Sequence, residues 1–429
     1  ARNSCTEKLR SALPHVICPR RCAWSSPSQG PTLHKMINAV ANKMVRKTNL
    51  DCKHYRGLLS HCLARVYSSS PPLRAFESNI TEGIREKIGR GLHRKQLHPL
   101  NIVKCMVEGY FSKRFQTKSG ETLFKYYDNL DPYVSTIQCF DELLVPKDHI
   151  SRSKSDTFYL DENTVLRTHT SAHQQELMKS GNRAFLATGD CYRRDEIDSS
   201  HYPVFHQMEG VYVFEDPNID SELVVSDLKD TLEGLVLELF GTAETRWVDA
   251  YFPFTDPSLE LEVYFQGDWL EVLGCGQIQS KILEDTGNGH LKGWAFGIGL
   301  ERLAMALFQI PDIRLFWSED TRFLEQFSEN KIIKFKEFSK YPLCYKDISF
   351  WEPAGFHEND LCAYVRDNAG DLAEKVTLID RFTHPKTGKT SSCFRIEYRS
   401  MERSLTNTEV DEIQDRLRNE LATLGYELR

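Results

Sequence analysis

Two stretches near the middle of the chain constrain the fold most, because they are typical of strands that follow one another through short turns. Residues 246–254 read RWVDAYFPF, and residues 259–276 read LELEVYFQGDWLEVLGCG. At the start of the second stretch apolar and acidic residues alternate, so Glu260 and Glu262 share one face of a strand. Short turns join antiparallel neighbours, whereas parallel neighbours need long crossovers. The pattern therefore predicts a largely antiparallel sheet.

Helical segments precede and interrupt these strands, which indicates an α+β fold. Residues 80–113 are helical in character, with a break near His98-Pro99. Residues 222–241 repeat apolar residues at helical spacing and close with Gly241, a typical C-terminal cap. From residue 75 to 327 the sequence therefore predicts one domain in which helices flank an antiparallel sheet.

The connection between two further predicted strands is unusually long and charged. Residues 189–210, GDCYRRDEIDSSHYPVFHQMEG, lie between the apolar runs AFLAT and VYVF. A plain hairpin turns in about two to five residues, and a longer charged loop is typical of a ligand site. The chain has no GxxxxGK[ST] and no GxGxxG after a strand, and GIGLER at 297–302 lacks the third glycine. A bound nucleotide would therefore be held by side chains on the antiparallel sheet.

A lysine-rich connector at 328–340 leads into a second predicted domain, residues 341–429. Its order of strand, helix, two strands, helix and short strand is the βαββαβ order of a ferredoxin-like unit. The last helix begins with a capping box from Thr406 to Glu409. Residues 381–403 carry six basic and two acidic side chains with aromatic residues between them. This composition suits single-stranded nucleic acid, but it also suits a solvated sheet face, and the segment alone leaves both open.

The first 74 residues differ from the rest in charge. They hold 13 basic and two acidic side chains, whereas residues 75–429 hold 41 basic and 59 acidic ones. A basic, serine-rich leader without an apolar core predicts an organellar transit peptide, the alternative being a basic tail that touches nucleic acid. No stretch approaches the about 20 apolar residues of a membrane span. The 12 cysteines form no CxxC pair and are expected to be free thiols.

Taken together, several motifs resemble a known family. YRRDEIDSSHYPVFHQMEG resembles motif 2 of the class II aminoacyl-tRNA synthetases, and GWAFGIGLERLAM resembles motif 3. LRTHTSAHQ, WVDAYFPFTDPSLELEV and WLEVLGCG are similar to the phenylalanyl enzymes in their single-chain organellar form. The resemblance implies a class II catalytic domain with an antiparallel sheet, followed by a ferredoxin-like anticodon-binding domain. It also implies that a monomer in the mitochondrial matrix or chloroplast stroma attaches phenylalanine to tRNA through phenylalanyl-adenylate, using ATP and Mg²⁺.

The resemblance assigns a first group of residues to ATP. Arg193 and Arg302 match the motif 2 and motif 3 arginines, which would neutralise the facing carboxylate and phosphates. Phe205 would stack on the adenine, and Glu271 would bind Mg²⁺ or ATP. Asp195 stands where the family often has glutamate, which accepts from the adenine amino group. The implied ATP-binding set is Arg193, Asp195, Ser200, His201, Tyr202, Phe205, Glu271 and Arg302.

A second group is assigned to phenylalanine and a third to tRNA. Glu209 would hold the substrate ammonium group, and Phe252 and Phe254 would flank its ring. The implied amino-acid set is His169, Ser171, Ala172, His173, Gln174, Gln207, Met208, Glu209, Phe252, Phe254, Ala295 and Phe296. The candidate tRNA contacts are Arg381, Lys386, Lys389, Arg395 and Arg399.

There are two alternatives to this function. A synthetase-like tRNA-binding protein without catalysis would be expected to lack Arg193, Arg302 or Glu209, and all three are present. A metal hydrolase that uses His169 and His173 predicts stoichiometric zinc, although no third ligand has suitable spacing. Because a hydrophobic pocket rejects an added hydroxyl weakly, and residues 75–429 leave no room for an editing domain, measurable tyrosine mischarging is expected.

Overall fold

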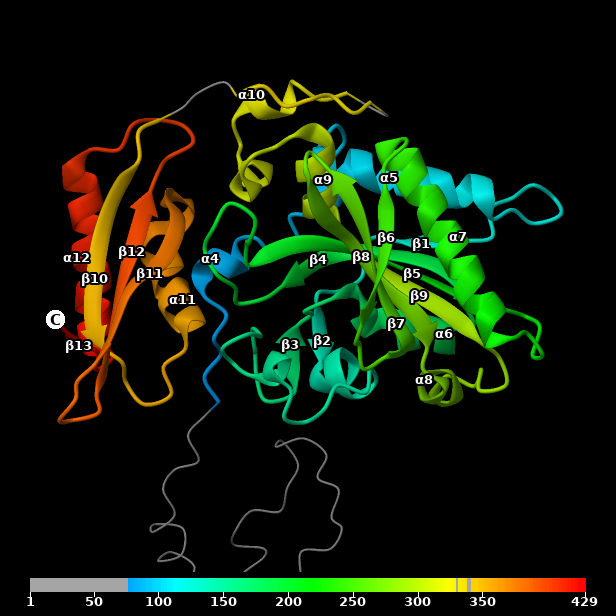
Figure 1. Cartoon of the computed structure of the whole chain (residues 1–429), viewed down its shortest axis with the longest axis horizontal. Coiled ribbons are helices and arrows are strands. Elements are labelled where there is room, and N and C mark those ends of the chain that lie inside the picture. Colours follow the sequence, from blue (N-terminus) through cyan, green and yellow to red (C-terminus); the bar gives the residue numbers. More distant parts are fainter. Residues whose placement is uncertain (1–75, 329–330, 338–340) are drawn as a thin grey trace, which may run out of the picture. The chain divides into compact units, whose positions relative to one another are not determined.

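The computed structural model describes residues 76–328, 331–337 and 341–429, so the predicted leader at 1–74 lies outside the described residues. Its larger sheet has seven strands in the order β1-β4-β5-β9-β8-β7-β6 (Figure 1). All neighbours are antiparallel except β1 and β4, which confirms the prediction of a largely antiparallel sheet. The strands are β1 (Lys125–Tyr127), β4 (Ala184–Tyr192), β5 (Val204–Val213), β6 (Thr245–Ala250), β7 (Thr255–Phe265), β8 (Asp268–Ile278) and β9 (Gly293–Gly299).

Three helices pack together on one face of this sheet (Figure 1). They are α5 (Pro99–Arg114), α7 (Ser221–Phe240) and α9 (Leu300–Phe308). Their apolar stripes, which include Val103, Leu232 and Leu303, meet alternate side chains of the central strands in the main hydrophobic core. This layer leaves the other set of alternate side chains on the sheet available for a site.

Short elements surround the opposite face of the sheet. A two-stranded sheet pairs β2 (Tyr133–Ser135) with β3 (Thr164–Leu166), and two smaller apolar clusters lie around it and around α6 and α8. The other elements of this region are η3 (Ile137–Asp141), η4 (Ile150–Arg152), η5 (Thr170–His173), α6 (Gln174–Lys179) and α8 (Ser280–Asp285). Four further short elements contribute to the main core instead, namely α4 (Glu82–Arg85), η2 (Leu92–Arg94), η6 (Ile313–Trp317) and α10 (Thr321–Leu324).

Helix boundaries follow the sequence signals closely where those signals are strong. Helix α5 begins at Pro99, with His98 as its N-cap, at the predicted break. Helix α7 ends at Phe240, and Gly241 follows as its cap with φ of 70°. The segment before Pro99 was predicted to be helical, but it holds only α4 and η2. Gly89 and Gly91 adopt positive φ there and interrupt the helix.

Strand β6 ends earlier than predicted. The stretch RWVDAYFPF was expected to be a strand to residue 254, but pairing with β7 stops at Ala250. Pro253 has no N–H group for a strand ladder, so the chain leaves the sheet in a turn. Tyr251, Phe252 and Phe254 therefore lie on a loop at the end of the sheet.

The C-terminal domain has the predicted ferredoxin-like order. Its four strands run β11-β12-β10-β13, all antiparallel, and helices α11 and α12 cover one face (Figure 1). The elements are β10 (Cys344–Trp351), α11 (Glu358–Ala369), η7 (Gly370–Leu372), β11 (Ala373–Thr383), β12 (Thr390–Tyr398), α12 (Asn407–Thr423) and β13 (Glu427–Leu428). The capping box between Thr406 and Glu409 is present at the start of α12.

Within the described residues, Cys139, Cys191, Cys275, Cys344, Cys362 and Cys393 are free thiols, as predicted. None of the helices found there has the length and apolar character needed to cross a bilayer.

Candidate active site

A cavity of about 710 Å³ opens on the sheet face away from α5, α7 and α9. Side chains or backbone from β5, β8, β9, the charged loop after β4 and the loop after β6 line it. Most of the residues that the sequence assigned to ATP and phenylalanine meet here. They are His169, Ser171, Arg193, Asp195, Ser200, His201, Tyr202, Phe205, Gln207, Glu209, Phe252, Phe254, Glu271, Ala295, Phe296 and Arg302.

Strand β5 supplies one wall, because its residues alternate between the cavity and the core. Phe205, Gln207 and Glu209 line the cavity. Met208, which the sequence also assigned to phenylalanine, points the other way and is completely buried in the main core. Ala172, His173 and Gln174 do not line the cavity either: all three are buried on η5 and at the start of α6.

Glu209 is the most unusual group in the cavity. Its side chain is almost fully buried, and its Oε2 atom has no hydrogen-bond partner among the described residues. Burial raises the pKa of Glu209 to about 8, and a hydrogen bond from the Ser171 hydroxyl opposes the shift. An unpartnered buried carboxyl group is costly unless a ligand completes its hydrogen bonds. The geometry therefore suits a cationic group of a ligand.

The apolar part of the cavity lies beside this carboxyl group. The rings of Phe252 and Phe254 stack with centroids 5.8 Å apart and planes 14° apart. Ala295 contributes its small side chain on the same face as Glu209. Phe296, by contrast, turns its ring into the core against Phe111 at 5.4 Å, so only its backbone can line the cavity.

The floor of the cavity contains alternating glycines that the sequence reading passed over. Gly274 on β8 pairs with Gly297 on β9, and Gly299 follows two residues later. A Cβ atom at Gly274 would lie 2.7 Å from the Phe252 ring, and one at Gly297 would lie 2.7 Å from the Gln207 amide nitrogen. The floor is therefore kept open by the absence of side chains. The signal for this floor is the glycine spacing in GCG and GIG, although the sequence predicted only a strand over the first and a fragment of a phosphate loop over the second.

Two exposed arginines provide positive charge at the cavity. The Arg193 side chain donates from Nε to the Thr168 carbonyl oxygen at 2.9 Å, and its guanidinium lies 5.1 Å from the centre of the Phe205 ring. Arg302 donates to the Glu271 carboxylate at 2.9 Å, and both side chains of that pair are about half exposed, at 49% and 47%. Such a pair is weak in water, so an anionic ligand can compete for the arginine.

The charged loop from Arg193 to Pro203 is internally braced. Asp198 accepts from the His201 ring at 2.8 Å and from the Ser200 backbone at 2.7 Å. Burial would raise the pKa of Asp198, but hydrogen bonds from His201 and Ser200 bring it well below its usual range. The hydrogen bond to Asp198 raises the pKa of His201 despite partial burial. His201, one of the residues assigned to ATP, is therefore favoured as a cation.

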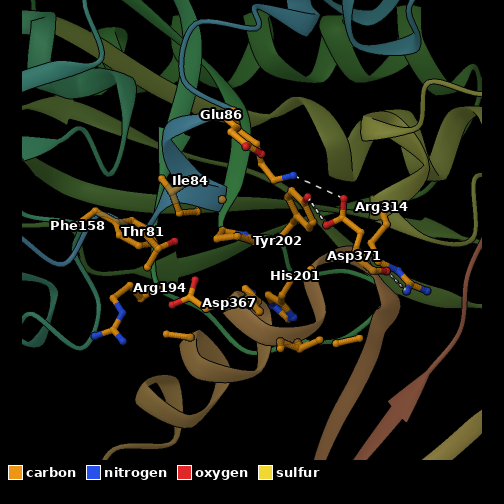
Figure 2. Close-up of a pocket in the computed structure, with 18 of the residues that line it drawn as sticks. Thr81, Ile84, Glu86, Phe158, Arg194, His201, Tyr202, Arg314, Asp367 and Asp371 are labelled. Carbon is orange, nitrogen blue, oxygen red and sulfur yellow. Dashed lines mark hydrogen bonds and ion pairs between the residues drawn. The ribbon is translucent and has the colours of Figure 1, made fainter. Parts of the chain in front are cut away.

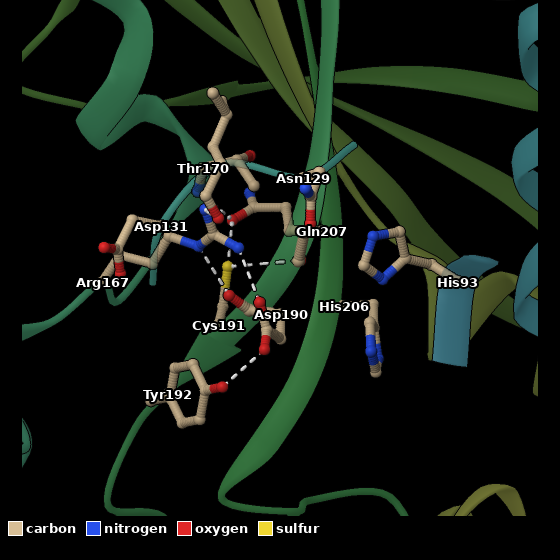
Figure 3. A network of polar contacts seen from close by, with 12 residues as sticks. His93, Asn129, Asp131, Arg167, Thr170, Asp190, Cys191, Tyr192, His206 and Gln207 are labelled. Carbon is tan, nitrogen blue, oxygen red and sulfur yellow. Dashed lines mark hydrogen bonds and ion pairs between the residues drawn. The ribbon is translucent and has the colours of Figure 1, made fainter. Parts of the chain in front are cut away.

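A buried polar network supports β4 and β5 from behind the cavity (Figure 3). Arg167 donates to the Asp190 carboxylate at 2.6 Å, and the Tyr192 hydroxyl donates to the other carboxylate oxygen at 2.5 Å. Burial would raise the pKa of Asp190, but Arg167 and the Tyr192 hydroxyl hold it below its usual value. Arg167 also contacts the His173 ring at 3.0 Å, so that ring is engaged in packing. Sequence reasoning missed Arg167 and Asp190, which lie 23 residues apart and show no shared motif.

Glu301 supports β5 in a similar way from the core side of the sheet. Its carboxylate accepts from the His206 backbone N–H at 2.7 Å and contacts the His206 ring at 2.7 Å. Both side chains are buried. Because His206 lies between Phe205 and Gln207, this pair fixes the part of β5 that faces the cavity.

The C-terminal domain holds the charged loop from the other side. Arg194 donates to Asp360 at 2.8 Å, and the Tyr202 hydroxyl donates to Asp371 at 2.6 Å. Ile197 inserts into the hydrophobic core of the ferredoxin-like domain. A second cavity of about 270 Å³ lies at this contact. Figure 2 shows Tyr202 and Asp371 pointing toward one another there. The Tyr202 hydroxyl, which the sequence assigned to ATP, is therefore engaged by the C-terminal domain.

Four of the five basic residues assigned to tRNA are paired with acidic groups. Arg395 binds Asp347 at 2.8 Å and lies 4.3 Å from the centre of the Tyr345 ring. Arg381 pairs with Glu352, Lys389 with Glu427 and Arg399 with Glu374. Only Lys386 has no acidic partner among the described residues. These surface pairs are weak, so the cations remain available to a polyanion.

Comparison with known proteins gives matches over both domains. Residues 94–327 match the core domain of class II tRNA synthetases (F), and residues 339–429 match the ferredoxin-fold anticodon-binding domain. The chloroplastic/mitochondrial phenylalanine–tRNA ligase of Arabidopsis thaliana is 55% identical over 82% of this chain and 83% of its own length. The mitochondrial phenylalanine–tRNA ligase of Dictyostelium discoideum is 44% identical over 92% of this chain and 100% of its own. That of Mus musculus is 49% identical over 78% and 82%.

Proposed function

Because this chain belongs to the class II phenylalanine–tRNA ligases, we propose that it attaches phenylalanine to its tRNA through a phenylalanyl-adenylate, for protein synthesis in an organelle. The named relatives are mitochondrial or chloroplastic/mitochondrial proteins. The leader at 1–74 would act as the transit peptide, to the mitochondrial matrix, the chloroplast stroma or both.

The buried carboxyl group of Glu209 is the observation that supports the proposal most strongly. Its buried carboxyl group has an unpartnered oxygen and lies at the same cavity as the stacked rings of Phe252 and Phe254. Phenylalanine offers an ammonium group and a phenyl ring in the matching arrangement. Aromatic contacts of this kind are worth about 0.5–1.5 kcal/mol per pair beyond area burial.

Arg193 would serve the activation step. A carboxylate oxygen of phenylalanine bonds to the α-phosphorus of ATP, the bond to the bridging oxygen breaks, and pyrophosphate leaves with the electron pair. Two anions must approach one another for this reaction, and the Arg193 guanidinium would neutralise both. Phe205, already beneath that guanidinium, would support the adenine.

Arg302 and Glu271 would meet the triphosphate. In the ligand-free protein these two side chains neutralise one another at 2.9 Å. The described residues contain no cluster of three or more metal-ligating side chains. Glu271 lines the cavity and would give the ion one carboxylate ligand. That donor set fits Mg²⁺, which proteins commonly hold with one or two carboxylates together with substrate phosphates. When bound, the ion would offset the negative charge of the phosphates.

In the second step the enzyme would pass the amino acid to tRNA. A terminal ribose hydroxyl oxygen bonds to the carboxyl carbon, the bond from that carbon to the adenylate oxygen breaks, AMP leaves with the electron pair, and the hydroxyl proton goes to solvent. The ferredoxin-like domain would bind the anticodon, through Arg381, Lys386, Lys389, Arg395 and Arg399. Because one chain carries both domains, we infer that it acts as a monomer, with residues 75–327 as the catalytic domain, 328–340 as the linker and 341–429 as the anticodon-binding domain.

The test is charging of tRNA with labelled phenylalanine by the purified chain. We expect acid-precipitable label that depends on ATP, on tRNA and on Glu209, with Glu209→Gln reducing charging at low phenylalanine. A tRNA-binding protein without catalysis would retain tRNA and yield no charged product. That outcome from folded protein would contradict the proposal.

A further inference from the structure

One aromatic side chain at the cavity, that of Tyr251, has no role in the proposed function. Tyr251 is 78% exposed, the largest value among the exposed large hydrophobic side chains of the described residues. It lines the cavity that holds the proposed adenylate site. Within the described part of the chain, no ring, cation or hydrogen-bonding group contacts its side chain. Phe252 and Phe254, by contrast, stack on one another, and Phe205 lies under Arg193.

The backbone around Tyr251 is fixed even though its side chain is free. The preceding residue, Ala250, is the last to pair in β6. On the other side, the Phe252 N–H donates to the Ser258 hydroxyl at 3.1 Å, and the Thr255 N–H donates to the Phe252 carbonyl oxygen at 3.2 Å. The backbone turn therefore places the Tyr251 side chain at the cavity, where its ring is free to rotate. A single exposed aromatic residue is ordinary on a protein surface, but one that a hydrogen-bonded turn presents beside a binding pocket is available for a ligand.

The transfer step would place a nucleobase of the tRNA at the rim of the cavity. The amino-acid end of the adenylate is placed by Glu209 and Phe252, and its nucleotide end by Arg193 and Phe205, so the cavity interior is occupied when tRNA arrives. The last nucleotide of a tRNA is single-stranded, and its ribose must reach the carboxyl carbon between those two ends. Its base must then lie outside, near the cavity mouth. Proteins hold unpaired bases chiefly by stacking them on aromatic side chains.

We propose that Tyr251 stacks on the base of the terminal adenosine of tRNA and so positions its ribose for acyl transfer. This inference rests on the proposed function, because it assigns a further contact to the same site. Phe252 binds the amino acid and its neighbour Tyr251 binds the nucleotide that receives it, so one rigid turn would bring the two reactants together. The contact is common to all tRNAs, because they share the terminal adenosine. It therefore adds rate and affinity without adding discrimination between tRNAs.

The experiment separates activation from transfer in the full chain. Phenylalanyl-adenylate is formed first, tRNA is added by rapid mixing, and single-turnover transfer is followed by quench. We expect Tyr251→Ala to slow transfer at subsaturating tRNA about tenfold, while Tyr251→Phe, which keeps the ring, stays within about twofold of the unmodified protein. Phenylalanine-dependent pyrophosphate exchange should change less than about twofold in both variants. Tyr264→Ala is the matched control, because Tyr264 is 45% exposed on β7 and does not line the cavity.

A tRNA whose terminal ribose lacks its base makes the test specific. With that substrate, Tyr251→Ala should produce no further slowing, because the partner of the ring is already missing. Equal slowing on the intact and the abasic tRNA would overturn the inference, as would unchanged transfer or a loss of exchange that matches the loss of transfer. Absence of phenylalanine-dependent exchange in the unmodified protein would instead refute the proposed function.

Discussion

Replacing Glu209 by glutamine is expected to stabilise the ligand-free protein at alkaline pH. Burial raises the pKa of Glu209 to about 8, and a hydrogen bond from Ser171 opposes the shift. A carboxyl group whose folded-state pKa lies above its unfolded value contributes stability that is complete below the unfolded pKa. That contribution is lost as the pH rises through the folded-state pKa. The relevant window therefore runs from about pH 4.5 to pH 8.

The expected loss of stability follows from the size of the shift in the pKa of Glu209. At about 1.4 kcal/mol per pKa unit, ionising this group in its buried position should remove roughly 4 kcal/mol of stability between pH 5 and pH 8.5. Glutamine has nearly the same shape and cannot ionise, so the variant escapes this loss. Urea-induced unfolding of both proteins at pH 5, 7 and 8.5 measures the difference. The exposed Glu162 provides a control for the change from a carboxylate to an amide, because Glu162→Gln leaves Glu209 in place and should retain the loss of stability between pH 5 and pH 8.5.

The same variant should weaken phenylalanine binding. The substrate ammonium needs the ionised carboxylate, and with a pKa of about 8 only a minor fraction of Glu209 is ionised at pH 7. In the unmodified protein the Kd for phenylalanine should therefore fall about tenfold per unit between pH 6 and pH 8 and then level off. Burial and the positive charge of Arg193 lower the pKa of His169 to about 3, so this ring stays neutral throughout.

Equilibrium dialysis with labelled phenylalanine measures both features of the binding. The glutamine variant should bind about 10- to 100-fold more weakly at pH 8, since it loses a charge-assisted hydrogen bond, and should lack the slope. A variant with unchanged affinity, together with a stability difference that does not depend on pH, would refute the reasoning about Glu209.

Three further predictions concern the pocket and its support. Gly274→Ala should raise the KM for phenylalanine about tenfold or more in pyrophosphate exchange. The Cβ atom of the alanine would lie 2.7 Å from the Phe252 ring and would displace that ring. An unchanged KM would contradict this reasoning. Ala295→Gly should increase tyrosine-dependent exchange relative to phenylalanine, because it enlarges an apolar pocket that already rejects a hydroxyl weakly; discrimination above about 10⁵ in both proteins would contradict the weak rejection. Asp190→Asn should lower the free energy of unfolding by about 3–5 kcal/mol, because it leaves the buried Arg167 without its 2.6 Å partner. A loss of stability below about 1 kcal/mol in urea unfolding would show that the pair is not essential.

Regular patterns in the sequence predicted much of the fold. Alternation along residues 259–265 predicted β7, and the helical spacing of apolar residues predicted α7 to within a residue at each end. The βαββαβ order of the last domain was also predicted correctly, and the capping box marked the start of its last helix. The bounds were wrong where a proline or a glycine within the predicted stretch interrupted the element. Pro253 ended β6 early, and Gly89 and Gly91 broke the first predicted helix.

The site was predicted less completely than the fold. Motif residues such as Arg193 and Glu209 were assigned individually, but alternation on β5 sends Met208 into the core, and the ring of Phe296 turns away from the cavity on β9. The Arg167 to Asp190 pair depends on tertiary contact between segments that share no motif. Contacts from the C-terminal domain to the charged loop, such as that of Asp360 with Arg194, were equally invisible, because a linear pattern carries no information about which surfaces meet.

The decisive measurement is amino-acid-dependent exchange of pyrophosphate into ATP with all twenty amino acids. We expect exchange with phenylalanine, weaker exchange with tyrosine and none with the others. We also expect collapse of the signal in Arg193→Ala but not in Arg90→Ala, an exposed arginine that does not line the cavity. Exchange that survives Arg193→Ala would contradict the role given to this arginine. Folded protein that binds tRNA and shows no exchange with any amino acid would contradict the account as a whole.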